Sequence, residues 1–372
     1  MEATLTTIDG LRARMAAQGL DALIGMSPEN VAYTIGFLVP SHPVNRHRRT
    51  ISVVTADGRS VLIVVSVEAP LARERSAIRD VRAYDQFKDA PMRVLADCIA
   101  ELGLERGRLG LELDYMPAGD YLQLSSTLTG AEFVPSRELF LAARMIKNEV
   151  EIDRLRRIAR ITDAAEAAAV ERFQVGMTEK QLAAVITDAV LSNGGDAVRS
   201  NIGSGPRSGI VNPKPADRAI VQGDVVRIEI LATLENHQSN VTRTAVVGEP
   251  TSEQARIWNV LMEAREEALK LLAPGTPAKL LWQAYASHCR SKGLEPTLSF
   301  LGHGIGLTGH EEPYLTADTE IILQPGTVLT YEPFFMVPGE MGFHIEDMFL
   351  VTDGGYELMS DVTTNESLIR LA

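Results

Sequence analysis

The sequence predicts a two-domain α/β protein, and three observations lead to this prediction. In residues 1–140, short apolar runs of β type alternate with amphipathic helical stretches, which is typical of an α/β domain. In residues 141–372, two helices are followed by strands, and this order then repeats with a unit of roughly 110 residues. The chain has 372 residues, which is long enough for two domains with large buried cores.

The elements of the first domain follow from its apolar pattern. Strands are predicted at the strings DALIGM, ISVVTADG and SVLIVV, which turn signals such as Ala56-Asp57-Gly58 separate. Helical spacing of apolar residues predicts helices over residues 8–19, 70–77 and 90–103. We therefore expect a sheet with helices between its strands.

The second domain is predicted to contain longer helices, and the sequence signals for where a helix begins are clearer there. Thr178 with Gln181 three residues later is a capping-box pattern, so we expect a helix to begin there. In chain order, the other predicted elements are a helix over 147–173, two strands over 224–247 with a polar turn at 235–237, helices over 252–273 and 277–292, and strands over 327–352.

The composition excludes some partners. Lysine and arginine number 36 against 49 acidic residues, a net charge of -13, which argues against nucleic acid or an anionic membrane as a partner. No apolar run is long enough to span a bilayer, and the first residues lack the apolar core of a signal peptide. The two cysteines, Cys98 and Cys289, are far apart and favour reduced thiols. We expect a cytoplasmic protein.

The C-terminal part holds polar residues where strand or turn structure alone would not require them. Glu229 and Glu332 stand within apolar strands, where a carboxylate is costly unless it is paired, hydrogen-bonded or metal-bound. Taken singly, each has a structural explanation, as an outward strand residue or a turn residue. The whole set is Asn212 in NPKP, Glu229 in VVRIEILA, Asn240 in SNVTRT, His303 and His310 in GHGIGLTGHEEP, Glu332 in LTYEPFF and Glu346 in FHIEDMFLV.

The order of these strings resembles the family of creatinase, aminopeptidase P and prolidase. Glu229 and Asn240 stand eleven residues apart, as the first two acidic positions do in that family, and GHGIGL, HEEP, YEP and IEDMFLVTDGG follow. The strings SPENVAYTIGF and VGMTEKQLAAVI are also similar, so the resemblance spans nearly the whole chain. It implies a ribonuclease-H-like N-terminal domain and a pseudo-symmetric pita-bread domain. It also implies a homodimer in which the partner's N-terminal domain borders the active site.

The chain departs from the family at the metal-binding positions. Peptidases of the family hold two divalent ions with two Asp, one His and two Glu, but Glu229 and Asn240 stand at the Asp positions here. The amide oxygen of Asn240 is a poor bridging ligand, so we expect no stable two-metal site. We expect no cofactor; the alternative is one divalent ion (Mn, Zn or Fe) on His303, Glu332 and Glu346. Asn212 replaces a usual His, and His344 replaces a usual Arg.

These departures lead to a hypothesis about function. Like creatinase, the protein would hydrolyse a C–N bond in a small cationic or zwitterionic molecule without a catalytic metal. Glu332 and Glu346 would orient the cationic end, while His303 or His310 takes the proton from water. The residues expected to bind substrate are Glu229, Asn240, Asn212 and His344, together with Arg46 and Arg48, which would clamp a carboxylate in the partner's site.

Three alternatives remain open from the sequence. The first is a metal-dependent Xaa-Pro aminopeptidase or dipeptidase, whose activity a chelator would remove. The second is a lyase, because a pocket of carboxylates and imidazoles also abstracts protons. The third is a binding protein that kept the fold and lost the chemistry, since Asn212 and Asn240 leave two roles of the family unfilled.

Overall fold

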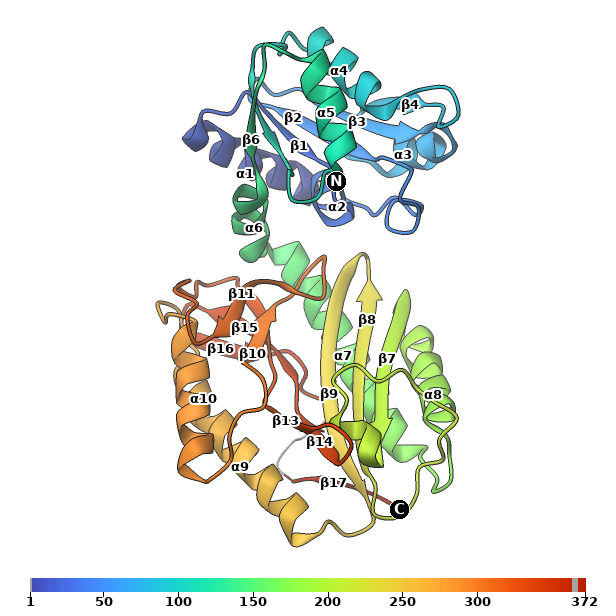
Figure 1. Cartoon of the computed structure of the whole chain (residues 1–372), viewed down its shortest axis with the longest axis vertical. Coiled ribbons are helices and arrows are strands. Elements are labelled where there is room, and N and C mark those ends of the chain that lie inside the picture. Colours follow the sequence, from blue (N-terminus) through green and yellow to red (C-terminus); the bar gives the residue numbers. More distant parts are fainter. Residues whose placement is uncertain (1, 363–366) are drawn as a thin grey trace. The chain divides into compact units, whose positions relative to one another are not determined.

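The structure is a computed structural model that describes residues 2–362 and 367–372. The chain divides into two compact units, Met1–Arg144 and Met145–Ala372, and both are α/β (Figure 1). The fold class that the sequence predicts is therefore confirmed. Within the described residues, no helix has both the length and the apolar character to cross a bilayer.

The N-terminal unit is built on one six-stranded sheet of order β4-β3-β2-β1-β5-β6. The strand β2 pairs antiparallel with β1 and β3, and the remaining neighbours pair in parallel. The strands are β1 (Ala22–Gly25), β2 (Ile51–Thr55), β3 (Ser60–Val65), β4 (Asp80–Tyr84), β5 (Arg108–Leu111) and β6 (Glu132–Pro135). The helices are α1 (Glu2–Gln18), α2 (Pro28–Ile35), α3 (Ala69–Arg75), α4 (Pro91–Glu101), α5 (Ala118–Thr127) and α6 (Arg137–Met145).

Helices cover both faces of this sheet, which explains the unbroken apolar run of β3. Ile63 packs in one cluster with residues of α4 and α5. Its neighbours Leu62 and Val64 pack in a second cluster with residues of α1, α2, α3 and α6. Because successive strand residues point to opposite faces, a strand buried on both sides is apolar at every position.

The first half of the C-terminal unit places two helices against an antiparallel sheet. Helices α7 (Glu149–Glu171) and α8 (Glu179–Ser192) lie beside the strands β7 (Ala197–Ser204), β8 (Val225–Leu234) and β9 (His237–Val247) (Figure 1). The expected capping box of Thr178 and Gln181 is present at α8. Glu235 and Asn236 both have positive φ, which produces the tight turn between β8 and β9.

The second half repeats this order of elements. Helices α9 (Ser252–Leu269) and α10 (Lys279–Ser291) contribute to one apolar cluster with the five-stranded sheet β11-β10-β12-β15-β16. Its strands are β10 (Phe300–Gly304), β11 (Glu311–Thr316), β12 (Val328–Tyr331), β15 (Asp347–Thr352) and β16 (Gly355–Leu358). The hairpin of β13 (Phe334–Val337) and β14 (Met341–His344) is separate, and β17 (Ile369–Leu371) joins the first half by pairing with β9. The two halves form the predicted pseudo-symmetric arrangement.

One bridge joins the two halves where polar side chains gather. Thr242 of β9 and Glu346, which precedes β15, exchange both backbone hydrogen bonds, each 3.1 Å long. The pairing of β8 with β9 sets Glu229 opposite Thr242 and Arg227 opposite Thr244. These four residues share one face of the sheet, because paired residues of antiparallel strands point the same way.

Helix α7 buries an acidic residue on the opposite face of that sheet. The side chain of Glu166 is wholly buried, and no side-chain donor among the described residues forms a hydrogen bond with its carboxylate oxygens. Burial raises the pKa of Glu166 well above its usual value of 4.5, although the nearby Arg243 acts in the opposite direction. The folded chain therefore keeps this carboxyl protonated at a pH where the unfolded chain ionises it.

We expect Glu166→Met to stabilise the protein, and more so at high pH. Between the unfolded pKa near 4.5 and the raised folded pKa, the folded state binds the extra proton, so its stability falls as pH rises. Removing the carboxyl should raise the free energy of unfolding by about 1–3 kcal/mol at pH 8 and by less at pH 5. Urea unfolding at both pH values measures this gain, with the exposed Glu171→Met as the control. A gain independent of pH would contradict the assignment of the proton.

Candidate metal centre

Three side chains of the second half converge in the interior of the C-terminal unit. His303 lies on β10, Glu332 follows β12, and Glu346 precedes β15; all three are buried. One ligand atom from each lies within 4.8 Å of the other two. His303 Nε2 is 3.4 Å from Glu332 Oε1 and 3.8 Å from Glu346 Oε1.

The hydrogen bonds of these side chains leave three lone pairs facing one another. His303 Nδ1 lies 2.9 Å from the carbonyl oxygen of Gly304, so the ring proton sits on Nδ1 and Nε2 carries a lone pair. His303 Nε2, Glu332 Oε1 and Glu346 Oε1 make no hydrogen bond. Buried acceptors without donors are costly, and a cation removes this cost.

Neighbouring side chains hold the second oxygen of each carboxylate. Glu332 Oε2 lies 3.2 Å from His344 Nε2, and Glu346 Oε2 accepts a 2.9 Å hydrogen bond from Thr242 Oγ1. Such hydrogen bonds orient a carboxylate, so that its other oxygen is directed at a metal ion. An imidazole nitrogen with two carboxylate oxygens suits zinc, iron or manganese, so these residues fit one divalent ion.

The electrostatics of the three residues agree with this fit. Burial, and then the neighbouring carboxylates, raise the pKa values of Glu332 and Glu346 well above the usual range. Burial, and then the adjacent His310, lower the pKa of His303 to about 3, which keeps its Nε2 lone pair free at neutral pH. A divalent ion would displace protons from the carboxyls, because ligands bind metals in their deprotonated form.

Glu229 and Asn240 fit an ion less well than the other three residues. Both are buried, and Glu229 Oε2 lies 3.4 Å from Arg227 Nη1. The side chain of Asn240 hydrogen-bonds to Glu229, while its own Oδ1 makes no hydrogen bond. Burial raises the pKa of Glu229, and Arg227 opposes this shift. Glu229 is thus already paired with a cation, and Asn240 offers only a neutral oxygen.

The two histidines predicted as general bases lie against each other. The rings of His303 and His310 stack at 3.6 Å between centroids, with 20° between their planes. His310 is exposed and lines a cavity of about 430 Å³ together with Arg199, Leu231 and Gln238. Although part of the residue is exposed, its ring is partly desolvated where it stacks on His303; this desolvation, followed by the charge of Arg199, lowers the pKa of His310, so its imidazole is neutral at pH 7. His310 therefore lies between the solvent and the buried centre.

The remaining predicted residues lie in several places. His344 is buried beside Glu332. Asn212 is exposed, and its Oδ1 accepts a 3.3 Å hydrogen bond from Asn201 Nδ2. Arg46 and Arg48 belong to the N-terminal unit, where Arg46 is exposed and Arg48 Nε donates a 3.0 Å hydrogen bond to Gln86. The clamp role of these two arginines stays a prediction.

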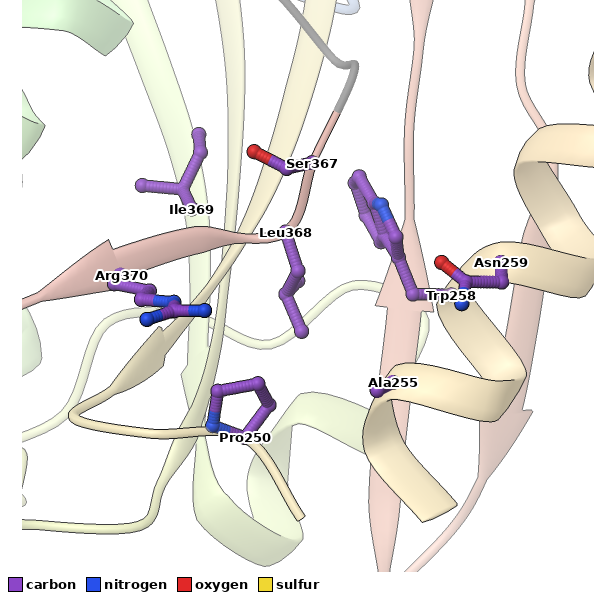
Figure 2. A pocket seen from close by; sticks show the side chains of 8 residues that line it. All are labelled: Pro250, Ala255, Trp258, Asn259, Ser367, Leu368, Ile369 and Arg370. Carbon is purple, nitrogen blue, oxygen red and sulfur yellow. The ribbon is translucent and has the colours of Figure 1, made fainter. Parts of the chain in front are cut away.

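A second cavity of about 450 Å³ lies away from all of these residues. Figure 2 shows Trp258 and Asn259 of α9 across from Leu368 and Arg370 at β17. The cavity is lined by none of the predicted site residues, and the lining residues that Figure 2 labels include no histidine, aspartate or glutamate. It therefore offers neither a ligand set nor an acid–base pair.

Two residues at the centre were missed by the sequence analysis. Arg227 interrupts the apolar string VVRIEILA two residues before Glu229, and Thr242 stands two residues after Asn240. In a strand, a spacing of two places both side chains on one face. This spacing of two residues from Glu229 and from Asn240 could have added Arg227 and Thr242 to the predicted site residues.

Comparisons with known proteins identify the class of this fold and centre. Residues 153–353 match the model of metallopeptidase family M24, and residues 8–146 match the creatinase/prolidase N-terminal domain. The chain belongs to metallopeptidase family M24 and is a hydrolase.

Several of its relatives are described as dipeptidases. The probable dipeptidase PepE of Mycobacterium tuberculosis is 31% identical over 92% of this chain and 90% of its own. A Xaa-Pro dipeptidase of Pyrococcus furiosus is 29% identical, over 92% and 93% of the two chains. Among solved structures, a prolidase from Pyrococcus horikoshii has a TM-score of 0.85 at 28% identity, covering 98% of this chain and all 100% of that one.

The expectation that the protein needs no cofactor is wrong. Membership of a metallopeptidase family overturns it, and the comparisons favour the metal-dependent peptidase over the creatinase-type hydrolase. The physical reason lies in where the ligands come from. Glu229 and Asn240 stand on β8 and β9 of the first half, whereas His303, Glu332 and Glu346 all belong to the second half. Substitution in one half leaves the ligand set of the other half intact.

Proposed function

We propose that the protein is a metal-dependent dipeptidase that hydrolyses the peptide bond before a proline, with a divalent ion bound by His303, Glu332 and Glu346. The observation that carries this proposal is the convergence of three buried, unpartnered ligand atoms within 4.8 Å. The relatives named as Xaa-Pro dipeptidases support the substrate class. When bound, the ion supplies a Lewis acid and lowers the pKa of bound water.

The other residues of the centre have distinct tasks in this proposal. His344 and Thr242 hold one oxygen of Glu332 and of Glu346, which keeps the ligand oxygens directed inward. His310 stands at the cavity as a neutral imidazole, so a ring nitrogen can accept a proton from the attacking water at neutral pH and return it to the proline nitrogen that leaves. Arg199 lines the same cavity and attracts the carboxylate of a short peptide.

Removal of the metal should abolish turnover. We expect hydrolysis of Ala-Pro and Gly-Pro to fall by about 100-fold or more after dialysis against a chelator, because the ion activates the attacking water. Addition of Mn²⁺, Zn²⁺ or Fe²⁺ should restore it. The assay separates and quantifies the free amino acids that are released, with Ala-Ala as the control substrate. Turnover of Ala-Pro that persists in chelator, with no metal in the protein, would rule out this proposal.

Creatine provides a second arm of the same experiment. The metal-dependent proposal predicts no release of urea from creatine, with or without chelator. Chelator-resistant hydrolysis of creatine would instead favour a creatinase-type reaction. The predicted homodimer, with the partner's N-terminal domain near the site, is tested separately by light scattering of the purified chain.

A further inference from the structure

The buried guanidinium of Arg227 is a strong cation at the centre that the proposed function does not use. Arg227 lies on β8, two residues before Glu229, and its side chain is completely buried. Burial lowers the pKa of Arg227 and the neighbouring carboxylates oppose this shift, but a guanidinium remains protonated in proteins, so the side chain carries its charge. Such a charge is kept only where the surrounding groups compensate for its lost hydration.

The contacts of Arg227 show what compensates for this loss. Its Nη2 donates to the carbonyl oxygens of Ile210 and Val211. Its Nη1 lies 3.4 Å from Glu229 Oε2 and 3.4 Å from His344 Nδ1. The guanidinium is thus fixed on the 210–211 loop and directed at the acidic centre.

This arrangement also determines the proton position on His344. A guanidinium offers only donors, so His344 Nδ1 accepts and the ring proton sits on Nε2. That proton is then donated to Glu332 Oε2 at 3.2 Å. Arg227 therefore reaches two carboxylates, Glu229 directly and Glu332 through His344, while Oε1 of Glu332 stays free for an ion.

We propose that Arg227 takes the place of a second divalent ion, so that the centre binds a single ion per chain. A second ion would need Glu229 as a ligand, but that carboxylate already neutralises Arg227 and receives a hydrogen bond from Asn240. A fixed positive charge in a poorly solvated interior also repels a second dication. This inference rests on the proposed function for the first ion and concerns only the second.

The test counts ions in a matched series of variants. Chelator-stripped protein is titrated with Mn²⁺ by calorimetry, and the paramagnetic resonance spectrum reports whether two Mn²⁺ ions are spin-coupled. We expect one ion in the wild type and in Asn240→Asp, because Arg227 remains in both. The double variant Arg227→Met/Asn240→Asp should bind two coupled ions, with the second bound on the order of 100-fold tighter than in Asn240→Asp alone. Arg227→Lys/Asn240→Asp keeps the charge and should bind one.

The outcomes separate this inference from the proposed function. Two ions in the wild type or in Asn240→Asp would overturn the role of Arg227 and leave the dipeptidase proposal standing. A single ion in the folded double variant, judged by circular dichroism, would also overturn that role. One ion in the wild type without hydrolysis of any Xaa-Pro dipeptide would overturn the dipeptidase proposal alone.

Discussion

The variant His303→Ala should lose both its divalent ion and its turnover of Xaa-Pro dipeptides. His303 supplies the only nitrogen among the three converging ligand atoms, and its Nε2 is the atom from which both carboxylate oxygens lie within 3.8 Å. Without His303, only the carboxyl groups of Glu332 and Glu346 remain at the centre. Their pKa values are raised well above the usual range, so we expect them to hold protons rather than a metal. Since the ion contributes several kcal/mol to transition-state stabilisation, kcat/KM should fall by about 1,000-fold or more.

The control for His303→Ala is Asn212→Ala. Asn212 is exposed and makes one 3.3 Å hydrogen bond with Asn201, so its loss should change kcat/KM by less than about threefold. Metal content is measured by mass spectrometry on the same preparations, and thermal unfolding confirms that both variants fold. Equal losses of activity in the two variants would mean that His303 has no special role in the metal centre. Full metal content in His303→Ala would contradict its role as a ligand.

The fold was largely predictable because its signals are local. The capping box at Thr178, the turn at Glu235 and Asn236, and the apolar run of β3 each depend on neighbours in sequence. The helix α2 (Pro28–Ile35) was not predicted from the apolar pattern. That helix is stabilised instead by a cap, in which the Ser27 side chain accepts from the backbone N–H of Asn30.

The three converging ligand residues of the candidate centre were predictable, but the contacts between them were not. The sequence places Glu332, Glu346 and His303 in suggestive strings, but the 3.4 Å contact of His303 with Glu332 joins residues of different strands. The proton positions also depend on long-range partners, as with His344 between Arg227 and Glu332. The main expectation, that no cofactor is bound, failed because it gave too much weight to Asn240, which lies on β9 in the other half of the unit.

The largest effect on stability should come from Arg243→Leu, beneath the centre. Arg243 Nη2 lies 3.0 Å from Asp163 Oδ1 and 2.9 Å from Asp347 Oδ1, and all three side chains are buried. Arg243 Nη1 also donates a 3.0 Å hydrogen bond to the backbone carbonyl of Glu346, which fixes this ligand from behind. Breaking a buried pair leaves uncompensated charge, so the loss should be about 3–5 kcal/mol. For a unit of this size, that lowers Tm by roughly 6–20 °C.

Arg256→Leu is the matched control for Arg243→Leu, because Arg256 also pairs with a carboxylate but at the surface. Its Nη2 lies 2.8 Å from Glu253, and both side chains are about half exposed (45% and 55%). An exposed ion pair contributes at most about 1 kcal/mol to stability. The two arginines have similar distances to their carboxylates, yet we expect Arg256→Leu to lower the free energy of unfolding far less than Arg243→Leu. The cost of Arg243→Leu should also depend on pH, with the larger cost at neutral pH. Burial acts to raise the pKa of Asp347, but Arg243 and Arg265 hold it below its usual value of 3.8, so the stability that this carboxylate contributes is present at neutral pH and is lost as the pH falls below about 4. Urea unfolding at pH 7 and at about pH 3 measures both effects; similar losses in the two variants at pH 7 would show that the buried network contributes no more than a surface ion pair.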